Sequence, residues 1–442
     1  MPARNAREFL RVKVRGLAAR LRRLGRIDNA FVGLRPQDMT HAPSRAHFEA
    51  ANQRLAKVEA QIRSRFDDVR ASVEDAPIQR VLVDIALVER ELDRARRLFG
   101  MFFEVFAQRG TSFAPALAAH DAIAQDCYQA IRGAAPRVFR GTLLKPVCYM
   151  EHGYSPATMR RGVSLGRLLG EPNPFPLIRI PWDRDHPWQA VFLHEVAHNL
   201  QADLGIWQEN RQAVVRRIIG QLRQPFLAST YGRWHKEIWA DLAALCLGGP
   251  AAAWGMAEFL AHPAPRTMTF RPGGAHPTAF LRVQILAEML RRQGFGDDAA
   301  RLERMWGTMY RPERGHRMPG SLLNSARHVI PHVVDETMFQ TRRNLAQRAV
   351  ADIIPFDRSH QAAILRGARL LEQRRTDRID IPPRHLLSAA SYALAGGRVN
   401  PRQLADDVIG RLNEETRGAR AASRQAAARQ PARETVAASV AA

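Results

Sequence analysis

Two histidines flank a glutamate in residues 194–198, which read His-Glu-Val-Ala-His. Residues four apart lie one above the other on the same face of an α-helix. His194 and His198 could therefore both bind one Zn²⁺, which takes histidine nitrogens at about 2.0–2.1 Å. Glu195 would lean over the open side of that metal, where its carboxylate could accept a proton from water. The spacing predicts a metal site with a general base beside it.

The surrounding sequence predicts the helix that would hold these residues. Apolar side chains recur at helical spacing from Trp188 to Leu200. Pro187 stands near the expected first helical position, and Gly205 is a typical residue for the end of a helix. The alternative is a pair of helix histidines that only bond to their neighbours.

A third ligand is expected further along the chain, because a catalytic zinc takes three protein ligands and keeps one open position. Glu237 and Asp241 stand four apart in a second predicted helix that ends near residues 248–250. We expect Glu237 to be the third ligand and Asp241 to bond the far nitrogen of a ligand histidine. His235 is the competing third ligand, because imidazole suits zinc equally well.

The ordered motifs resemble a known clan. H-E-x-x-H followed by E-x-x-A-D is similar to the gluzincins, the clan of thermolysin, and the alanine is typical of the branch of CaaX prenyl endopeptidases and HtpX-type peptidases. That branch also carries a His-Pro pair with an arginine six residues after the histidine, which His276, Pro277 and Arg282 match. The resemblance covers roughly residues 176–290.

The resemblance implies a zinc-dependent metallopeptidase with one Zn²⁺ per chain and a peptide or protein substrate. Glu195 would be the general base for a metal-activated water. His276 and Arg282 would be catalytic residues that bind the substrate carbonyl or the oxyanion of the transition state. A simple helix-start position before Pro277 is the alternative for His276.

A short strand is predicted before the histidine helix, and the resemblance implies that it is an edge strand. An exposed edge can pair with an extended peptide as an added strand. The substrate-binding residues would then be Leu177, Ile178, Arg179 and Ile180. An internal strand of the sheet is an open alternative.

The rest of the sequence predicts a mainly α (α+β) protein, with a zincin-like core and a small sheet. We expect a basic N-terminal segment with a helical hairpin at 1–112, in which residues 43–75 and 78–108 form long helices. The metallopeptidase domain would span 113–310, a helical region 311–417, and a disordered Ala/Arg-rich tail 418–442.

Composition and charge indicate which kinds of partner the chain could bind. The net charge of the 442 residues is +23, and only four of the 66 basic residues are lysines. The arginines are spread along the chain and no zinc-finger or RNP-like motif is evident, which disfavours nucleic-acid binding. Residues 1–30 combine leucines at helical spacing with arginines, so they could bind an anionic surface or an acidic partner. The alternative interpretation is an ordinary terminal helix that is docked on the protein or frayed.

The cysteines indicate the cellular compartment that the sequence favours. Cys127, Cys148 and Cys246 are widely spaced and odd in number, which argues against a disulfide framework and fits a reducing cytoplasm. No apolar run reaches the length of a transmembrane span, although relatives in this branch usually have one.

Two other functions stay open at this point. The long helical flanks could belong to a regulatory or effector protein, with a zincin core that is latent or recognises a single substrate. Non-specific nucleic-acid binding through the arginines is the weaker alternative.

Overall fold

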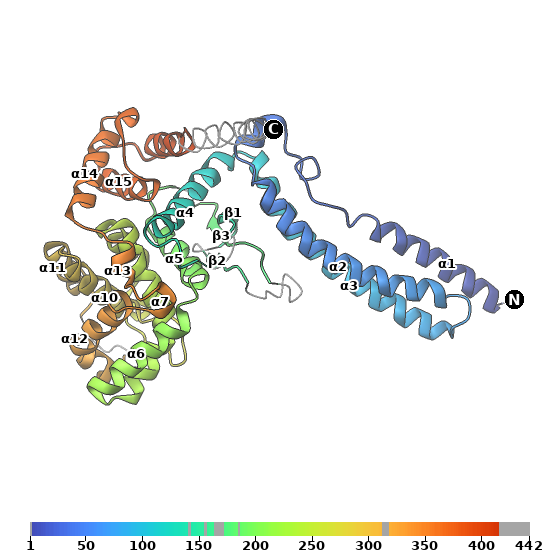
Figure 1. The fold of residues 1–442 in the computed structure, drawn as a ribbon, viewed down its shortest axis with the longest axis horizontal. Coiled ribbons are helices and arrows are strands. Elements are labelled where there is room, and N and C mark those ends of the chain that lie inside the picture. The colour runs from blue at the N-terminus through green and yellow to red at the C-terminus, as the bar shows by residue number, and fades with distance from the viewer. Residues whose placement is uncertain are drawn as a thin grey trace, which may run out of the picture. The chain divides into compact units, whose positions relative to one another are not determined.

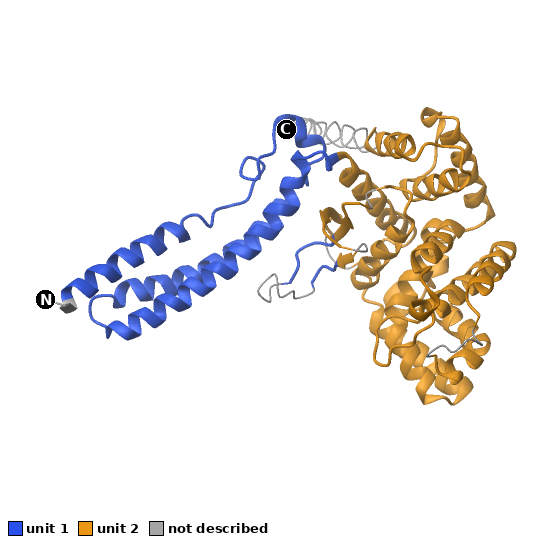
Figure 2. Cartoon of the chain, turned by 180° about the vertical axis from the view of Figure 1, so that it is seen from behind, with its two compact units in different colours: residues 1–114, 159–177 blue, residues 115–158, 178–442 orange. Residues whose placement is uncertain are grey.

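The computed structural model describes residues 2–139, 143–153, 157–162, 172–183, 186–311 and 318–414. The protein is mainly α-helical with one small three-stranded sheet, as the sequence predicted. Two compact units are present, and Figure 2 shows them in different colours. Unit 1 contains residues 1–114 and 159–177, and unit 2 contains residues 115–158 and 178–442.

Unit 1 is built on three long helices that lie side by side (Figure 1). They are α1 (Pro2–Leu21), α2 (Arg45–Ser72) and α3 (Ile78–Ala107), with short 3₁₀ turns at Pro36–Thr40 and Gln108–Gly110. Apolar residues at helical spacing, such as Leu55 and Ile62 on α2, are buried between the helices. The helical hairpin predicted at 43–108 is therefore present, and residues 2–21 pack along it as a further helix.

Unit 2 contains α4 (Ala114–Ala134, from its second residue on), and the sheet follows it in sequence. The strands are β1 (Val147–Glu151), β2 (Ala157–Met159) and β3 (Leu177–Pro181), and their order in the sheet is β1-β3-β2. The predicted strand is thus the middle one. Because both of its backbone edges face a neighbouring strand, it has no edge to offer to a peptide.

The prediction that residues 177–180 form an edge strand is therefore wrong, and the internal strand is correct. Leu177, Ile178 and Ile180 are buried in the core, and Arg179 pairs with Glu151 of β1 at 3.5 Å. The strand β2, which the sequence did not predict, is one of the two outer strands.

The helices that follow the sheet in sequence pack around α7. The order in sequence is α5 (Val191–Asp203), α6 (Trp207–Leu222), α7 (Pro225–Gly248), α8 (Pro250–Leu260), α9 (Ala264–Thr267), α10 (Ala279–Arg292) and α11 (Gly296–Met309). The helices α5, α6, α8 and α10 all contact α7, and every residue of α7 from Ile238 to its end is buried. Helix α5 begins at Val191, later than predicted, because residues 187–190 form turns. Gly205 follows it with a φ of +64°, as expected for a helix end.

The C-terminal helices belong to the same compact unit, so the boundary predicted near residue 310 does not separate two units. These elements are α12 (Gly320–Val334), a π-helical turn η4 (Asp335–Phe339), a 3₁₀ turn (Arg343–Leu345), α13 (Val350–Ile353), α14 (Arg358–Glu372), a 3₁₀ turn (Thr376–Arg378) and α15 (Pro383–Ala395). Residues 401–414 are also helical. The predicted tail at 418–442 lies outside the described residues.

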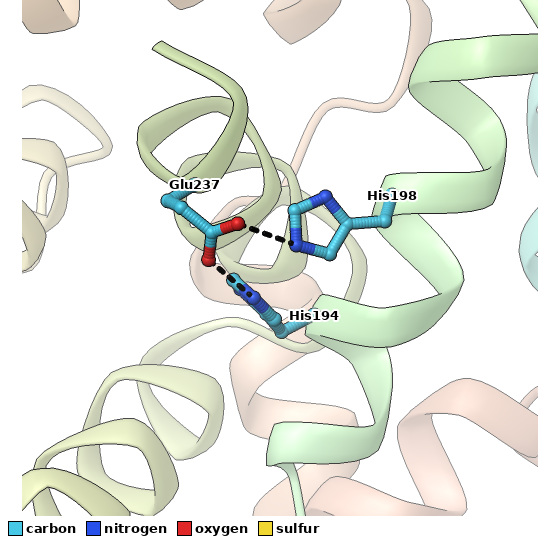
Figure 3. A group of neighbouring side chains, drawn as sticks. All are labelled: His194, His198 and Glu237. Carbon is cyan, nitrogen blue, oxygen red and sulfur yellow. Dashed lines mark ion pairs between the residues drawn. The ribbon is translucent and has the colours of Figure 1, made fainter. Parts of the chain in front are cut away.

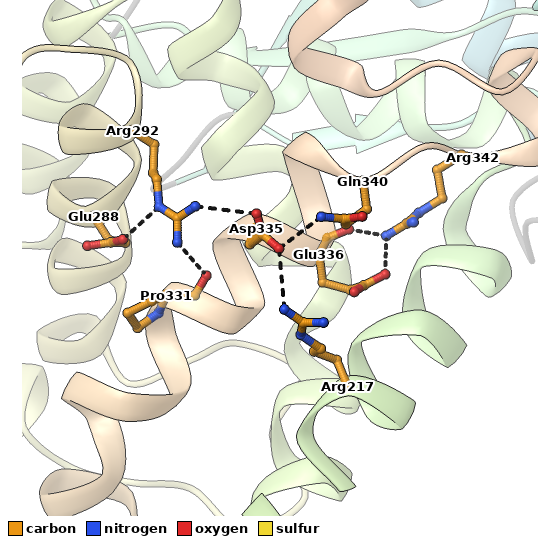
Figure 4. A network of polar contacts seen from close by, with 8 residues as sticks. All are labelled: Arg217, Glu288, Arg292, Pro331, Asp335, Glu336, Gln340 and Arg342. Carbon is orange, nitrogen blue, oxygen red and sulfur yellow. Dashed lines mark hydrogen bonds and ion pairs between the residues drawn. The ribbon is translucent and has the colours of Figure 1, made fainter. Parts of the chain in front are cut away.

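A polar network attaches η4 to the helices that flank α7 (Figure 4). Asp335 lies 3.3 Å from the guanidinium of Arg292 on α10 and 3.7 Å from that of Arg217 on α6. The buried Arg342 donates to the side chain of Glu336 at 3.1 Å and also to its carbonyl oxygen. These contacts join α6 and α10 through the C-terminal segment, which limits how far either helix can move relative to α7.

Among the described residues, no helix combines the length and the apolar character that crossing a membrane requires.

The close approach of α5 to the end of α7 yields a first prediction. A Cβ at Gly248 would lie 2.5 Å from Cδ1 of Leu193 and 2.9 Å from Oγ of Ser388. We expect Gly248→Ala to lower the free energy of unfolding by about 1–3 kcal/mol through overpacking. Chemical denaturation followed by tryptophan fluorescence measures this, because all seven tryptophans lie in unit 2.

The control for this variant is Gly307→Ala on α11, where an added Cβ meets open space. This substitution should be neutral or stabilising by about 0.5–1 kcal/mol, because alanine favours helices. Equal stability of the two variants would show that α5 and α7 are not in close contact at Gly248.

Candidate metal centre

Helices α5 and α7 bring His194, His198 and Glu237 together (Figure 3). The histidines project from successive turns of α5, and the glutamate faces them from α7. Nε2 of His194 lies 3.4 Å from Oε2 of Glu237, and Nε2 of His198 lies 3.4 Å from Oε1. The donor atoms all lie within 4.8 Å of one another, so this cluster could hold a metal ion.

The donor set fits a divalent metal. The 3.4 Å separations are longer than an ordinary N–H···O hydrogen bond, so the three side chains face a common point without being bonded to one another. Glu237 is largely buried, and no lysine or arginine lies within ion-pair distance of it in the described part of the chain. A buried carboxylate needs a compensating cation. Two imidazoles and one carboxylate are a ligand set that zinc accepts.

The electrostatics of the cluster also favour a cation. Burial alone would lower the pKa of His194, but the carboxylates of Asp241 and Glu237 outweigh it and raise that pKa to about 9. Burial and the nearby His194 lower the pKa of His198. Burial would raise the pKa of Glu237, but its contacts with the two histidines hold it well below the usual range. The carboxylates thus favour positive charge at this place.

Behind His194 lies a second carboxylate. Nδ1 of His194 is 2.8 Å from Oδ1 of Asp241, the contact that the sequence predicted for this aspartate. Asp241 in turn accepts two hydrogen bonds from Arg282 of α10, from Nε at 2.8 Å and from Nη2 at 2.6 Å. All three side chains are buried, and the arginine and the histidine hold the pKa of Asp241 below its usual value against the effect of burial. The series Arg282–Asp241–His194 fixes the orientation of one imidazole.

This position of Arg282 differs from the role that the resemblance implied. The guanidinium is buried, and it donates to Asp241 through a bidentate pair and also contacts the sulfur of Met256 at 3.6 Å. It lies behind the cluster of His194, His198 and Glu237, on the side of Asp241. The geometry therefore gives no support for Arg282 as a donor to an oxyanion, and supports a role in orienting the ligand through Asp241.

His276 lies at the outer side of the cluster. Its Nε2 is 3.5 Å from Oε2 of Glu237, while 69% of its side chain is exposed. A side chain so close to the cluster and so open to solvent can reach both a buried ligand and a molecule that arrives from outside. Of the His276 and Arg282 pair, only the histidine has such a position.

Glu195 is half-buried beside the cluster. Among the residues that the structure describes, nothing donates a hydrogen bond to its carboxylate or forms an ion pair with it. Its charge nevertheless acts on both His198 and Arg282. A carboxylate that is near the cluster and not engaged elsewhere can bind and deprotonate water.

His235, the alternative third ligand, is directed elsewhere. Its Nδ1 lies 2.8 Å from the carbonyl oxygen of Gly232, and its ring packs near the ring of Trp207 with centroids 6.1 Å apart. Burial lowers its pKa to about 4, so this ring is neutral at physiological pH. Glu237 is therefore the third member of the cluster.

The pairing of Arg282 with Asp241 is the contact at the candidate site that sequence reasoning missed. The signal was present, because Asp241 stands in an otherwise apolar helix segment, and a buried carboxylate needs a cationic partner.

Comparisons of the chain with protein-family models, with curated proteins and with solved structures find no match. The resemblance to gluzincins thus rests on the three sequence motifs and on the geometry of the cluster.

Metal content tests the cluster. Purified wild-type protein is expected to contain about one divalent metal ion per chain. Glu237→Ala should lose most of it, because only two ligands would remain, whereas Glu258→Ala, at an exposed position on α8, should keep it. Elemental analysis gives both the amount and the identity of the metal. A folded wild type that takes up no metal after reconstitution would contradict the assignment.

The pairing of Arg282 with Asp241 is tested by stability. Arg282→Gln would leave the buried carboxylate without its bidentate partner, so we expect the free energy of unfolding to fall by about 3–5 kcal/mol. The double variant with Asp241→Asn should lose less than the sum of the two single variants, because the unpaired charge is absent. Additive losses in denaturant titrations would show that the two residues do not depend on each other.

Proposed function

We propose that this protein is a zinc-dependent metallopeptidase that hydrolyses peptide bonds. The observation that carries the proposal is the buried cluster of His194, His198 and Glu237 with an unengaged carboxylate, Glu195, beside it. Structural zinc sites are closed by four protein ligands, and cysteine is common among them. Three ligands without cysteine, next to a carboxylate and an exposed histidine, are instead typical of hydrolytic sites.

In this proposal the roles follow from the positions. His194, His198 and Glu237 would hold the metal, and Asp241 with Arg282 would keep the His194 ring in place. A bound Zn²⁺ would supply a Lewis acid that polarises the scissile carbonyl and lowers the pKa of water toward about 7.

Side chains of the protein would transfer the protons and stabilise the developing negative charge. Glu195 would accept a proton from the attacking water and pass it to the nitrogen of the leaving amine. His276, on the solvent side of the cluster, would donate a hydrogen bond to the carbonyl oxygen as negative charge develops there. This assigns to His276 alone the role that the resemblance implied for His276 and Arg282 together.

The decisive variant is Glu195→Gln, which keeps the shape of the side chain and removes the base. We expect cleavage of a peptide library to fall by about 10²–10⁴-fold, while the metal content stays unchanged. Mass spectrometry of the library before and after incubation measures the cleavage.

Two outcomes would count against the proposal. Unchanged cleavage by Glu195→Gln would exclude this residue as the base. A metal-loaded wild type that cleaves no peptide in a broad library would favour the alternative of a latent or single-substrate module.

A further inference from the structure

Helix α1 carries two apolar faces, and only one of them is covered. Leu10, Val14, Leu17 and Leu21 are buried against the other helices of unit 1. Phe9 and Val12, three residues apart on another side of the helix, are 64% and 59% exposed. Gly16 and Ala19 continue this line toward the C-terminal end of α1 at helical spacing. We call the line 9–12–16–19 the exposed ridge.

The ridge leads into an apolar groove within unit 1. The groove has a volume of about 540 Å³, and its walls include the rings of Phe31, Phe99 and Phe103. Phe31 and Phe103 meet edge to face, with ring centroids 5.9 Å apart, and remain 48% and 39% exposed. Ala19 of the ridge also lines the groove. The two features therefore form one continuous apolar surface.

Cations border this surface. Arg20, Arg23 and Arg96 line the groove, and further exposed arginines follow the same helix and its end: Arg4, Arg15, Arg22 and Arg26. Arg20 is paired with Asp93 at 3.0 Å. No carboxylate of the described residues pairs with Arg4, Arg15, Arg22, Arg23 or Arg26. Glu8 is the single acidic residue of α1.

We propose that this surface of unit 1 binds an anionic lipid membrane, with α1 lying in the plane of the interface. The ridge runs from residue 9 to residue 19 of α1, about 15 Å at a rise of 1.5 Å per residue, so it is an elongated feature that a flat interface can cover along its length. Aromatic and aliphatic side chains on such a helix enter the boundary between headgroups and acyl chains, while arginines along its sides contact lipid phosphates. The groove would accept part of an acyl chain.

Charge complementarity favours lipid over a second copy of the chain. The arginines of one copy would face the equally basic surface of another, with a single acidic side chain on each α1 to offset them. An anionic bilayer instead offers negative charge over the whole length of the ridge.

Co-sedimentation of the full-length protein with vesicles tests the proposal. Binding is expected to vesicles of phosphatidylcholine with about one-third phosphatidylserine and to be at least about tenfold weaker to phosphatidylcholine alone. It should also weaken as salt is added, because the surface charges become screened.

Two double variants distinguish vesicle binding by the ridge from non-specific binding through any exposed apolar side chain. Phe9→Ser with Val12→Ser should weaken binding at least about tenfold, because both side chains would enter the interface. The matched control is Val83→Ser with Leu87→Ser. These residues of α3 are 55% and 40% exposed but lie on the side of that helix away from Glu89, which pairs with Lys13 of α1. Circular dichroism verifies that both double variants fold.

Several results would overturn the proposal. Equal binding to charged and uncharged vesicles would remove the role of the arginines, and equal losses in the two double variants would remove the role of the ridge. Self-association without vesicle binding, abolished by Phe9→Ser with Val12→Ser, would show that the surface joins two copies instead.

Discussion

Two carboxylates one turn apart in a buried helix set the main constraint on unit 2. Glu237 and Asp241 stand on α7, which is covered by other helices along most of its length. Removing a carboxylate from water costs several kcal/mol unless a positive partner replaces the lost hydration. The arrangement of the neighbouring helices supplies those partners. Helix α10 presents Arg282 to Asp241, and α5 presents two imidazoles to Glu237.

This requirement explains why the packing around α7 is close. Gly248 has no Cβ and so allows Leu193, the residue before the first histidine, to approach the end of α7. On the other sides, the network around Asp335 joins α6 to α10. The positions of the histidines relative to Glu237 thus depend on contacts from several helices that are distant in sequence. A ligand set held in this way needs little rearrangement to bind a metal.

Much of this could be predicted from local patterns. The long helices follow from apolar residues at helical spacing, and the His194–His198–Glu237 cluster follows from residue types and intervals. Asp241 was expected behind a ligand histidine for the same reason. These features depend on neighbours within one helix or on a motif whose parts keep a fixed order.

The features that sequence reasoning missed depend on long-range packing. Leu177 to Ile180 form a middle strand because β2, a three-residue segment with no strong strand pattern, pairs beside them. Arg282 lies behind the cluster because α10 approaches α7 from the side of Asp241, which spacing along the chain does not encode. The C-terminal helices join unit 2 through contacts such as the hydrogen bond from Ser388 to the carbonyl of Gly248. No local sequence motif predicts such a hydrogen bond.

The basic residues of α1 are arginines and one lysine, Lys13, and this has a further consequence. A guanidinium keeps its proton at every physiological pH, whereas imidazoles exchange theirs within or near that range. The positive charge along α1 is therefore constant in acid and in mild base. Only ionic strength changes the distance over which this charge acts. The histidine cluster of unit 2 has the opposite character, since its charge is set by protons and by any bound cation. Acidification would thus change the charge of the histidine cluster and leave the positive charge of α1 unchanged.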